Sequence, residues 1–185
     1  MNLETKIIKE SLGVLVLASI ISALGGIGLQ SVKEKIFLAL PLLIIFPALN
    51  GMVGNFGTVF ASKYTTLLYE NKISKKNLWN KALKKDYLLT LKVSLISSFY
   101  ISTLSSVIAL FGGFKLNPIF YLKILIMTII IAIFLISLIA IVSVSAGKYF
   151  YKKKEDPDNL LIPITTSIAD LGSMIVFSLL IFFFF

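Results

Sequence analysis

Five long apolar stretches follow one another in this chain of 185 residues, with short polar segments between them. Each stretch is long enough to cross a membrane, because a transmembrane helix needs about 20 apolar residues. They cover residues 11–29, 36–68, 87–111, 119–147 and 160–185. Little chain is left for a soluble catalytic domain, which needs about 50 residues or more. We therefore predict an all-α, polytopic membrane protein that forms a single domain of five transmembrane helices over residues 1–185.

The residue types in the chain exclude most kinds of enzyme chemistry. Hydrophobic residues make up 57% of the sequence and charged residues only 15%, while cysteine and histidine are both absent. Disulfide bonds, zinc sites of the Cys/His type and a histidine general base are therefore excluded. No phosphate-binding glycine loop and no nucleophile–base pair at a recognisable spacing occurs either. We predict that the chain is not an enzyme, and that any metal ion it binds is a hard cation held by oxygen.

All 18 basic residues are lysines, and their positions say more than the net charge of +9. In a soluble protein such a charge would suggest nucleic acid, which we do not expect as a partner here. Twelve lysines lie before the first span, between the second and third, and between the fourth and fifth, whereas four lie in the other two connections or at the start of the fourth span. The positive-inside rule then predicts a multi-pass protein of the cell membrane with its N-terminus in the cytoplasm and its C-terminus outside. Its cytoplasmic lysines would either contact the head groups of the lipid bilayer or only set the topology, and we favour the second interpretation.

The first apolar run has an alternative interpretation as a secretory signal. Lys6 and Lys9 precede it, as basic residues precede the apolar core of a signal peptide. The run is longer than a typical signal core, and no clear cleavage site of small residues follows it. We therefore predict a membrane span.

The second span is unusually long and rich in residues that disfavour helices. A continuous helix over residues 36–68 would measure about 50 Å, against a hydrocarbon core of about 30 Å. The span contains Pro41 and Pro47, followed by a cluster of amides and glycines: Asn50, Gly51, Gly54, Asn55 and Gly57. We predict a break in this helix near its middle, where irregular backbone would line a wet cavity or a transport site. Close helix packing through the glycines is the alternative.

The fifth span contains Asp170, the only acidic or basic residue in the middle of any span. It lies ten residues past Leu160, which is about 15 Å along a helix and half of the hydrocarbon thickness. Helical spacing places polar residues and a proline on one face: Pro163, Thr166, Ser167, Asp170 and Ser173. An intramembrane carboxylate indicates a functional site, so we interpret Asp170 as a cation site. A protonated carboxyl group bonded to a neighbouring helix is the alternative.

Two further regions have weaker indications. Asp156 and Asp158 precede the fifth span, where they would either cap its helix or line a cytoplasmic cation exit. The third span carries small polar residues at intervals of four, which favours close helix packing: Thr90, Ser94, Ser98, Ser102 and Ser106.

Two motifs resemble the MgtE-type magnesium transporters, and more closely their eukaryotic solute-carrier relatives. The segment PALNGMVGNFGT at residues 47–58, continuing to residues 61–63, resembles the second membrane helix of that family. The segment DPDN at residues 156–159, with Pro163, Thr165, Thr166 and Asp170 after it, resembles the last helix. The similarity covers nearly the whole chain, and the family likewise has five spans with its N-terminus inside.

The resemblance implies a homodimer with a central pore, which admits hydrated Mg²⁺ at a carboxylate of the last helix. Other divalent cations would use the same pore. Asp170 matches that carboxylate, and Thr166 and Asn55 fall beside the pore motifs. We expect Asn55, Thr165 and Thr166 to contact the hydration shell of the ion, and Asp158 to lie on its path. The chain would be a single-unit form without the cytoplasmic regulatory domains of bacterial members, and Val59 replaces a residue that is polar in many of them.

Two other functions remain open from the residues alone. A membrane scaffold or assembly subunit that transports nothing would use the small-residue faces for helix packing, with Asp170 paired to a lysine of another subunit. A transporter of a small organic solute would need residues that recognise the solute, and none is visible. Divalent competition in a flux assay separates these alternatives.

Overall fold

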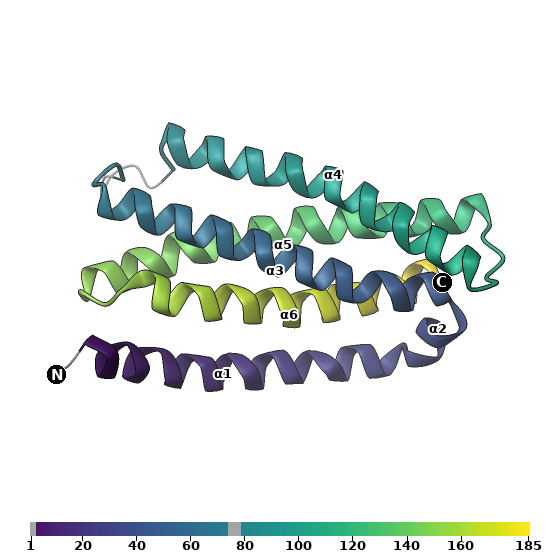
Figure 1. The fold of residues 1–185 in the computed structure, drawn as a ribbon, viewed down its shortest axis with the longest axis horizontal. Helices are drawn as coiled ribbons and strands as arrows, with labels where there is room; N and C mark the ends of the chain where they lie inside the picture. Colours follow the sequence, from purple (N-terminus) through teal and green to yellow (C-terminus); the bar gives the residue numbers. More distant parts are fainter. Residues whose placement is uncertain (1–2, 74–78) are drawn as a thin grey trace.

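The described part of the chain forms six α-helices joined by short connections. The computed structural model describes residues 3–73 and 79–185, and the side chains from residue 12 onward within these ranges. Figure 1 shows the helices lying side by side in an elongated bundle, and the described ranges contain no strand. The helices are α1 (Leu3–Ser31), α2 (Lys33–Leu38), α3 (Leu40–Tyr69), α4 (Lys81–Phe111), α5 (Pro118–Lys152) and α6 (Pro157–Phe184).

Five of these helices are long and apolar enough to cross a membrane, which confirms the predicted fold class. The exception is α2, which has only six residues. The two termini lie at opposite ends of the bundle, as an odd number of crossings requires (Figure 1). The α3–α4 and α5–α6 connections, both rich in lysine, lie at the same end as the N-terminus (Figure 1). Lys75 and Lys76 lie outside the described residues, as do the side chains of Lys6 and Lys9.

The second span differs from its prediction, because its helix is not broken near the middle. The interruption lies at Ala39, between α2 and α3, where φ is −115° and ψ is 84°. Pro41 falls in the first turn of α3, a position that suits proline because no helical partner is needed for its missing N–H. From there α3 continues without a break to Tyr69, with Pro47 inside it. The predicted wet cavity of irregular backbone around residues 50–57 is therefore wrong.

Gly57 shows why glycine occurs in this continuous helix. A Cβ atom added there would lie 3.1 Å from Cδ1 of Ile139 on α5 and 3.8 Å from Cβ of Thr165 on α6. The glycine therefore allows α3 to approach both helices closely, which is the alternative that the sequence left open. Because this packing offsets the low helix propensity of glycine, about 1 kcal/mol per residue, the helix persists.

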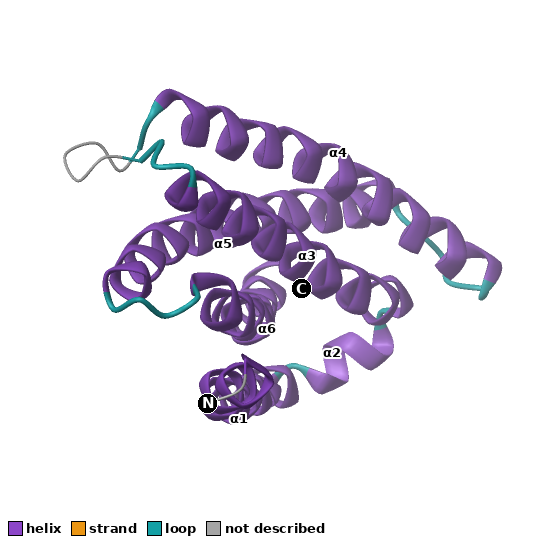
Figure 2. Cartoon of the chain, turned by 60° about the vertical axis from the view of Figure 1, so that its left-hand side comes forward, coloured by secondary structure: helices purple, strands orange, loops and turns teal. Residues whose placement is uncertain are grey.

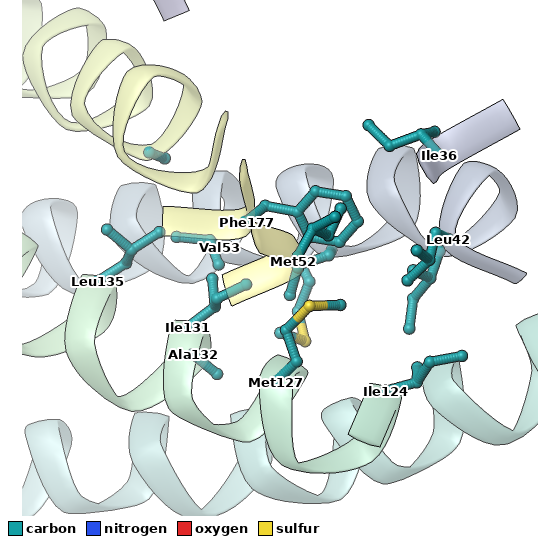
Figure 3. Packing of buried hydrophobic residues seen from close by; sticks show 14 of the residues in the cluster. Ile36, Leu42, Met52, Val53, Ile124, Met127, Ile131, Ala132, Leu135 and Phe177 are labelled. Atoms are coloured by element: carbon teal, nitrogen blue, oxygen red, sulfur yellow. The ribbon is translucent and has the colours of Figure 1, made fainter. Parts of the chain in front are cut away.

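The core lies where α3, α5 and α6 meet. Figure 3 shows Met127, Ile131 and Leu135 of α5 pointing toward Val53 of α3 and Phe177 of α6. Ile131, Leu135 and Phe177 are fully buried. The three central helices therefore hold one another in fixed register, and α6, the helix that carries Asp170, lies among them.

The remaining helices pack on this core from two sides. The polar face of α4 is buried, with Ser94, Ser98 and Ser102 at 0% exposure, and Ser102 bonds Thr128 of α5 over 2.8 Å. This confirms the predicted packing role of the small residues in the third span. On the other side α1 packs along α6, and α2 crosses from the end of α1 to α3 (Figure 2). Among the described residues, α6 is the only helix with which α1 makes an extended contact.

Candidate functional site

The carboxylate of Asp170 is the polar centre of the bundle. It lies near the middle of α6 and is half-buried between α1 and α3. Ser22 Oγ of α1 donates a hydrogen bond to Oδ2 over 3.0 Å, and Asn50 Nδ2 of α3 donates one to Oδ1 over 2.8 Å. Both carboxylate oxygens therefore have a donor, and the two donors come from two different helices.

The amide of Asn50 is bonded at both of its ends. Its nitrogen donates to Asp170, and its Oδ1 accepts a hydrogen bond from the hydroxyl of Ser173, one turn further along α6. The Ser173 hydroxyl also lies 3.1 Å from the carbonyl oxygen of Asp170. Ser173 is fully buried, so this group of polar atoms is closed to solvent on that side.

The partners of Asp170 carry no charge. The ion pairs of the described residues join Lys63 to Asp86 over 3.3 Å and Lys72 to Glu70 over 2.8 Å, and neither includes Asp170. A negative charge at the middle of a span costs about 2.5–3.5 kcal/mol or more to bury, and no cationic side chain of the described residues offsets that cost at Asp170. The site is thus electrostatically suited to a visiting cation.

The structure separates the two threonines that the sequence placed beside Asp170. Thr166 lies one turn before Asp170 on the same face of α6 and is partly exposed, and its hydroxyl donates to the carbonyl of Ile162 over 3.0 Å. Thr165 is fully buried, close to Gly57 of α3, and its hydroxyl donates to the same carbonyl over 3.1 Å. Thr166 therefore shares the face of Asp170, and Thr165 does not.

Asn55 lies on the outer surface of α3 in a single copy of the chain. Its side chain is exposed, five residues after Asn50 and so roughly 140° away around the helix. Asn50 points toward Asp170, so Asn55 points away from it. The structure of one chain does not bring Asn55 and Asp170 together.

Asp158 belongs to a second polar group at the first turn of α6. Asp156 caps the helix by accepting a hydrogen bond from the Asp158 N–H over 3.1 Å, and the Tyr69 hydroxyl donates to Asp156 over 3.4 Å. Ser62 and Thr65 of α3 lie beside the Asp158 carboxylate, yet its Oδ1 is buried without a hydrogen-bond partner among the described residues. Twelve residues of helix, about 18 Å, separate Asp158 from Asp170, so the two carboxylates form separate sites.

The donor set of one chain suits a hydrated ion better than a bare one. Among the side chains that the structure describes, no group of three or more Asp, Glu, His or Cys residues could hold a metal ion. A lone carboxylate can instead accept hydrogen bonds from the waters of an ion that dehydrates reluctantly, as Mg²⁺ does. The geometry therefore fits recognition of a divalent cation through its hydration shell.

Sequence reasoning placed Asn50 in the polar cluster of the second span and Ser173 on the face of Asp170, but it named neither them nor Ser22 as partners of Asp170. Each is a polar residue within an apolar span, and Ser22 and Asn50 lie at the depth of Asp170 in their own helices. Matching polar residues by depth across the predicted spans would have included them among several candidates, without pairing them with Asp170. Their spacing along the sequence could not supply the pairing, because the contacts join residues that are 148 and 120 positions apart.

Comparison with known proteins identifies the family of the chain. Residues 46–180 match the MgtE family, described as a divalent cation transporter. No curated protein and no solved structure matches the chain. The match includes α6 up to Leu180 and α3 from Phe46 onward, and with them both helices that form the Asp170–Asn50 contact. Because the match covers most of the chain, this multi-pass membrane protein belongs to the MgtE family of divalent cation transporters.

Proposed function

We propose that the chain transports Mg²⁺ across the cell membrane as a homodimer, with Asp170 of each copy facing a shared pore. Other divalent cations of similar hardness would compete at the same site. The observation that carries this proposal is the carboxylate at the middle of α6, bonded by two neutral donors and by no lysine of the described residues. Its charge is therefore available to a cation.

Two copies of Asp170 would balance the charge of one Mg²⁺ ion. A pair of carboxylates across a twofold axis carries a charge of −2, which matches one Mg²⁺ and offsets much of the cost of burying each carboxylate. The ion would keep several waters, as Mg²⁺ usually does in proteins. Lone pairs of Asp170 that Ser22 and Asn50 leave free would accept hydrogen bonds from these waters.

The outer face of α3 supports a second copy as the partner. Gly51 and Asn55 are exposed there, and a Cβ added at Gly51 would meet no atom within 4 Å. Small residues on a lipid-facing surface allow close approach of another helix. In a homodimer built on this face, Asn55 would line the shared pore from α3 while Asp170 lines it from α6.

The other predicted site residues would each have a different role in the passage of the ion. Thr166 shares the face of Asp170 and would meet the hydration shell one turn away. Thr165 is buried, and it would contribute by holding the Ile162 carbonyl in the turn before Thr166. Asp158, at the lysine-rich end of the bundle, would lie at the cytoplasmic end of the path. With the N-terminus inside, a negative membrane potential would favour uptake by about 2.3 kcal/mol per charge per 100 mV.

Substitution of Asp170 by asparagine tests the proposal. Asp170→Asn keeps the size of the side chain and removes its charge, so Mg²⁺ flux into proteoliposomes should fall to the level of protein-free liposomes. Asp86→Asn is the matched control, because Asp86 pairs with Lys63 at the end of the bundle and should leave the flux unchanged.

The same assay addresses the scaffold alternative. If the unmodified protein gives no flux under an imposed Mg²⁺ gradient, the transport proposal fails. If it gives flux that Asp170→Asn leaves intact, the cation site lies elsewhere in the chain.

A further inference from the structure

The two donors to Asp170 are held in different ways. Asn50 is on α3, a core helix, and its amide is bonded at its second end by the buried hydroxyl of Ser173. Ser22 is on α1, which packs along α6 alone among the described helices, and no second hydrogen bond of the Ser22 hydroxyl is present within the described residues. The Asn50 side chain is therefore held by hydrogen bonds at both ends of its amide, whereas the Ser22 hydroxyl has only its bond to Asp170 among the described residues.

Asp170 and Ser173 together hold the Asn50 amide in one orientation. An asparagine side chain has a donor NH₂ group and an acceptor oxygen, and the two can exchange places by rotation of the amide. The carboxylate accepts the NH₂ group of Asn50, and the Ser173 hydroxyl donates to Oδ1 at the other end, which keeps the amide in this orientation. A donor in that position stabilises the ionised carboxylate and fixes its orientation.

Ser22 offers the same chemistry as a water molecule. A hydroxyl donates one hydrogen bond, as a water of a hydrated cation would. It is partly exposed, and its distance of 3.0 Å to the carboxylate is longer than the 2.8 Å of the Asn50 bond. A hydration water could therefore replace it without any loss in the number of hydrogen bonds that the carboxylate accepts.

We propose that Asn50, oriented by Ser173, is a positioning residue for Asp170, and that the Ser22 hydroxyl is a placeholder which a water of the incoming cation displaces. This inference rests on the proposed role of Asp170 and adds residues from α1 and α3 to it. It assigns opposite effects to the two donors: loss of Asn50 weakens cation binding, and loss of Ser22 strengthens it, because nothing then has to be displaced.

Thermal unfolding of the detergent-solubilised full chain, titrated with MgCl₂, measures both effects. Ion binding to the folded state raises the melting temperature, and the dependence on concentration gives the half-saturating Mg²⁺ level. We expect Asn50→Leu to raise this level on the order of tenfold, since a hydrogen bond to a charged group is lost. Ser173→Ala should raise it by a smaller factor, because the amide can then rotate, and Ser22→Ala should lower it.

Matched controls separate positioning from simple loss of stability. Ser102→Ala also removes a buried interhelical hydrogen bond, to Thr128, and should lower the melting temperature without Mg²⁺ while leaving the half-saturating level unchanged. Ser19→Ala lies one turn before Ser22 and removes only a bond to the carbonyl of Leu15, so it should change neither quantity appreciably.

The outcomes distinguish this inference from the proposed function. If Asp170→Asn abolishes the Mg²⁺ response while Asn50→Leu and Ser173→Ala leave the half-saturating level unchanged, the positioning role is refuted and the Asp170 site stands. If Ser22→Ala raises the level, Ser22 is a supporting donor and not a placeholder. If Asp170→Asn keeps the full Mg²⁺ response, the proposed cation site itself fails.

Discussion

Asp170 and Asp158 show how strongly the surroundings of a carboxylate differ along one helix. Asp170, in the middle of α6, has a neutral donor on each oxygen. Asp158, at the first turn, has a buried Oδ1 without a hydrogen-bond partner among the described residues, and Asp156 lies two positions before it. A buried acceptor left without a donor costs about 1–3 kcal/mol, so Asp158 lowers the stability of the chain in the absence of a cation.

Replacement of Asp158 by asparagine tests this cost. Asp158→Asn removes the charge and supplies an NH₂ group to the buried position, so the free energy of unfolding without divalent cations should rise by about 1 kcal/mol. Chemical or thermal unfolding in detergent measures the change. In Asp156→Asn the capping oxygen is retained, and that variant should change stability less. A destabilised Asp158→Asn variant would show that the carboxylate is already satisfied in the folded protein.

The sequence alone identified Asp170, but it did not identify the side chains that donate hydrogen bonds to it. A lone acid in an apolar span is visible without a structure, because its burial requires an explanation. Ser22 and Asn50 could not be paired with it, since that requires knowledge of which helices are neighbours and how they are rotated. Thr165 and Thr166 differ by one position, yet the packing of α6 buries one and leaves the other partly exposed.

Among the helices, α1 and α3 differ in how they join the bundle. Extended contacts link α3 with α4, α5 and α6, whereas α1 has α6 alone among the described elements. Gly25 lies where α1 and α6 approach closely: an added Cβ would lie 2.6 Å from Sδ of Met174 and 3.2 Å from the backbone Cα of Leu171. The sequence predicted both spans, but it placed the interruption of the second span at its glycines. Glycine permits close packing as well as breaks, and composition cannot separate the two.

Two adjacent glycines allow a test of the α1–α6 contact. Gly25→Val would push α1 away from α6 and should destabilise the protein by about 1–3 kcal/mol, as overpacking does. Gly26→Val makes the same chemical change one residue later, where an added Cβ meets nothing within 4 Å. Because the two changes share the same helix propensity, the difference between their melting temperatures isolates the contact. Equal melting temperatures would mean that α1 is not held through Gly25.

For the whole molecule, a single chain presents only half of the arrangement that we propose. Asp170 lies between α1 and α3, while Asn55 lies on the outer face of α3. In the proposed homodimer, the second copy would bring these residues to one path. The family and the number of spans followed from the sequence, whereas the relation between two copies depends on surface shape, which no local pattern encodes.

Cysteine cross-linking tests the homodimer directly, since the chain has no cysteine of its own. If the exposed face of α3 lies near a twofold axis, Gly51→Cys should form a disulfide-linked dimer under mild oxidation in membranes, because the two Cα atoms would approach within about 7 Å. Gly13→Cys is the control: it is equally open, and it lies on α1 away from this face. Equal cross-linking of both variants would indicate random collision, and none at Gly51 would place the interface elsewhere.

The dependence of α1 on α6 also has a consequence for biosynthesis. The ribosome makes α1 before α6, so α1 reaches the bilayer before the helix along which it packs has been made. Until then α1 must stay in the lipid by its hydrophobicity alone, which its outward Leu15, Ile20 and Leu24 provide. When α6 then inserts, it completes the helix bundle. In the same step Asp170 comes to lie beside the Ser22 hydroxyl and the Asn50 amide, which donate hydrogen bonds to it.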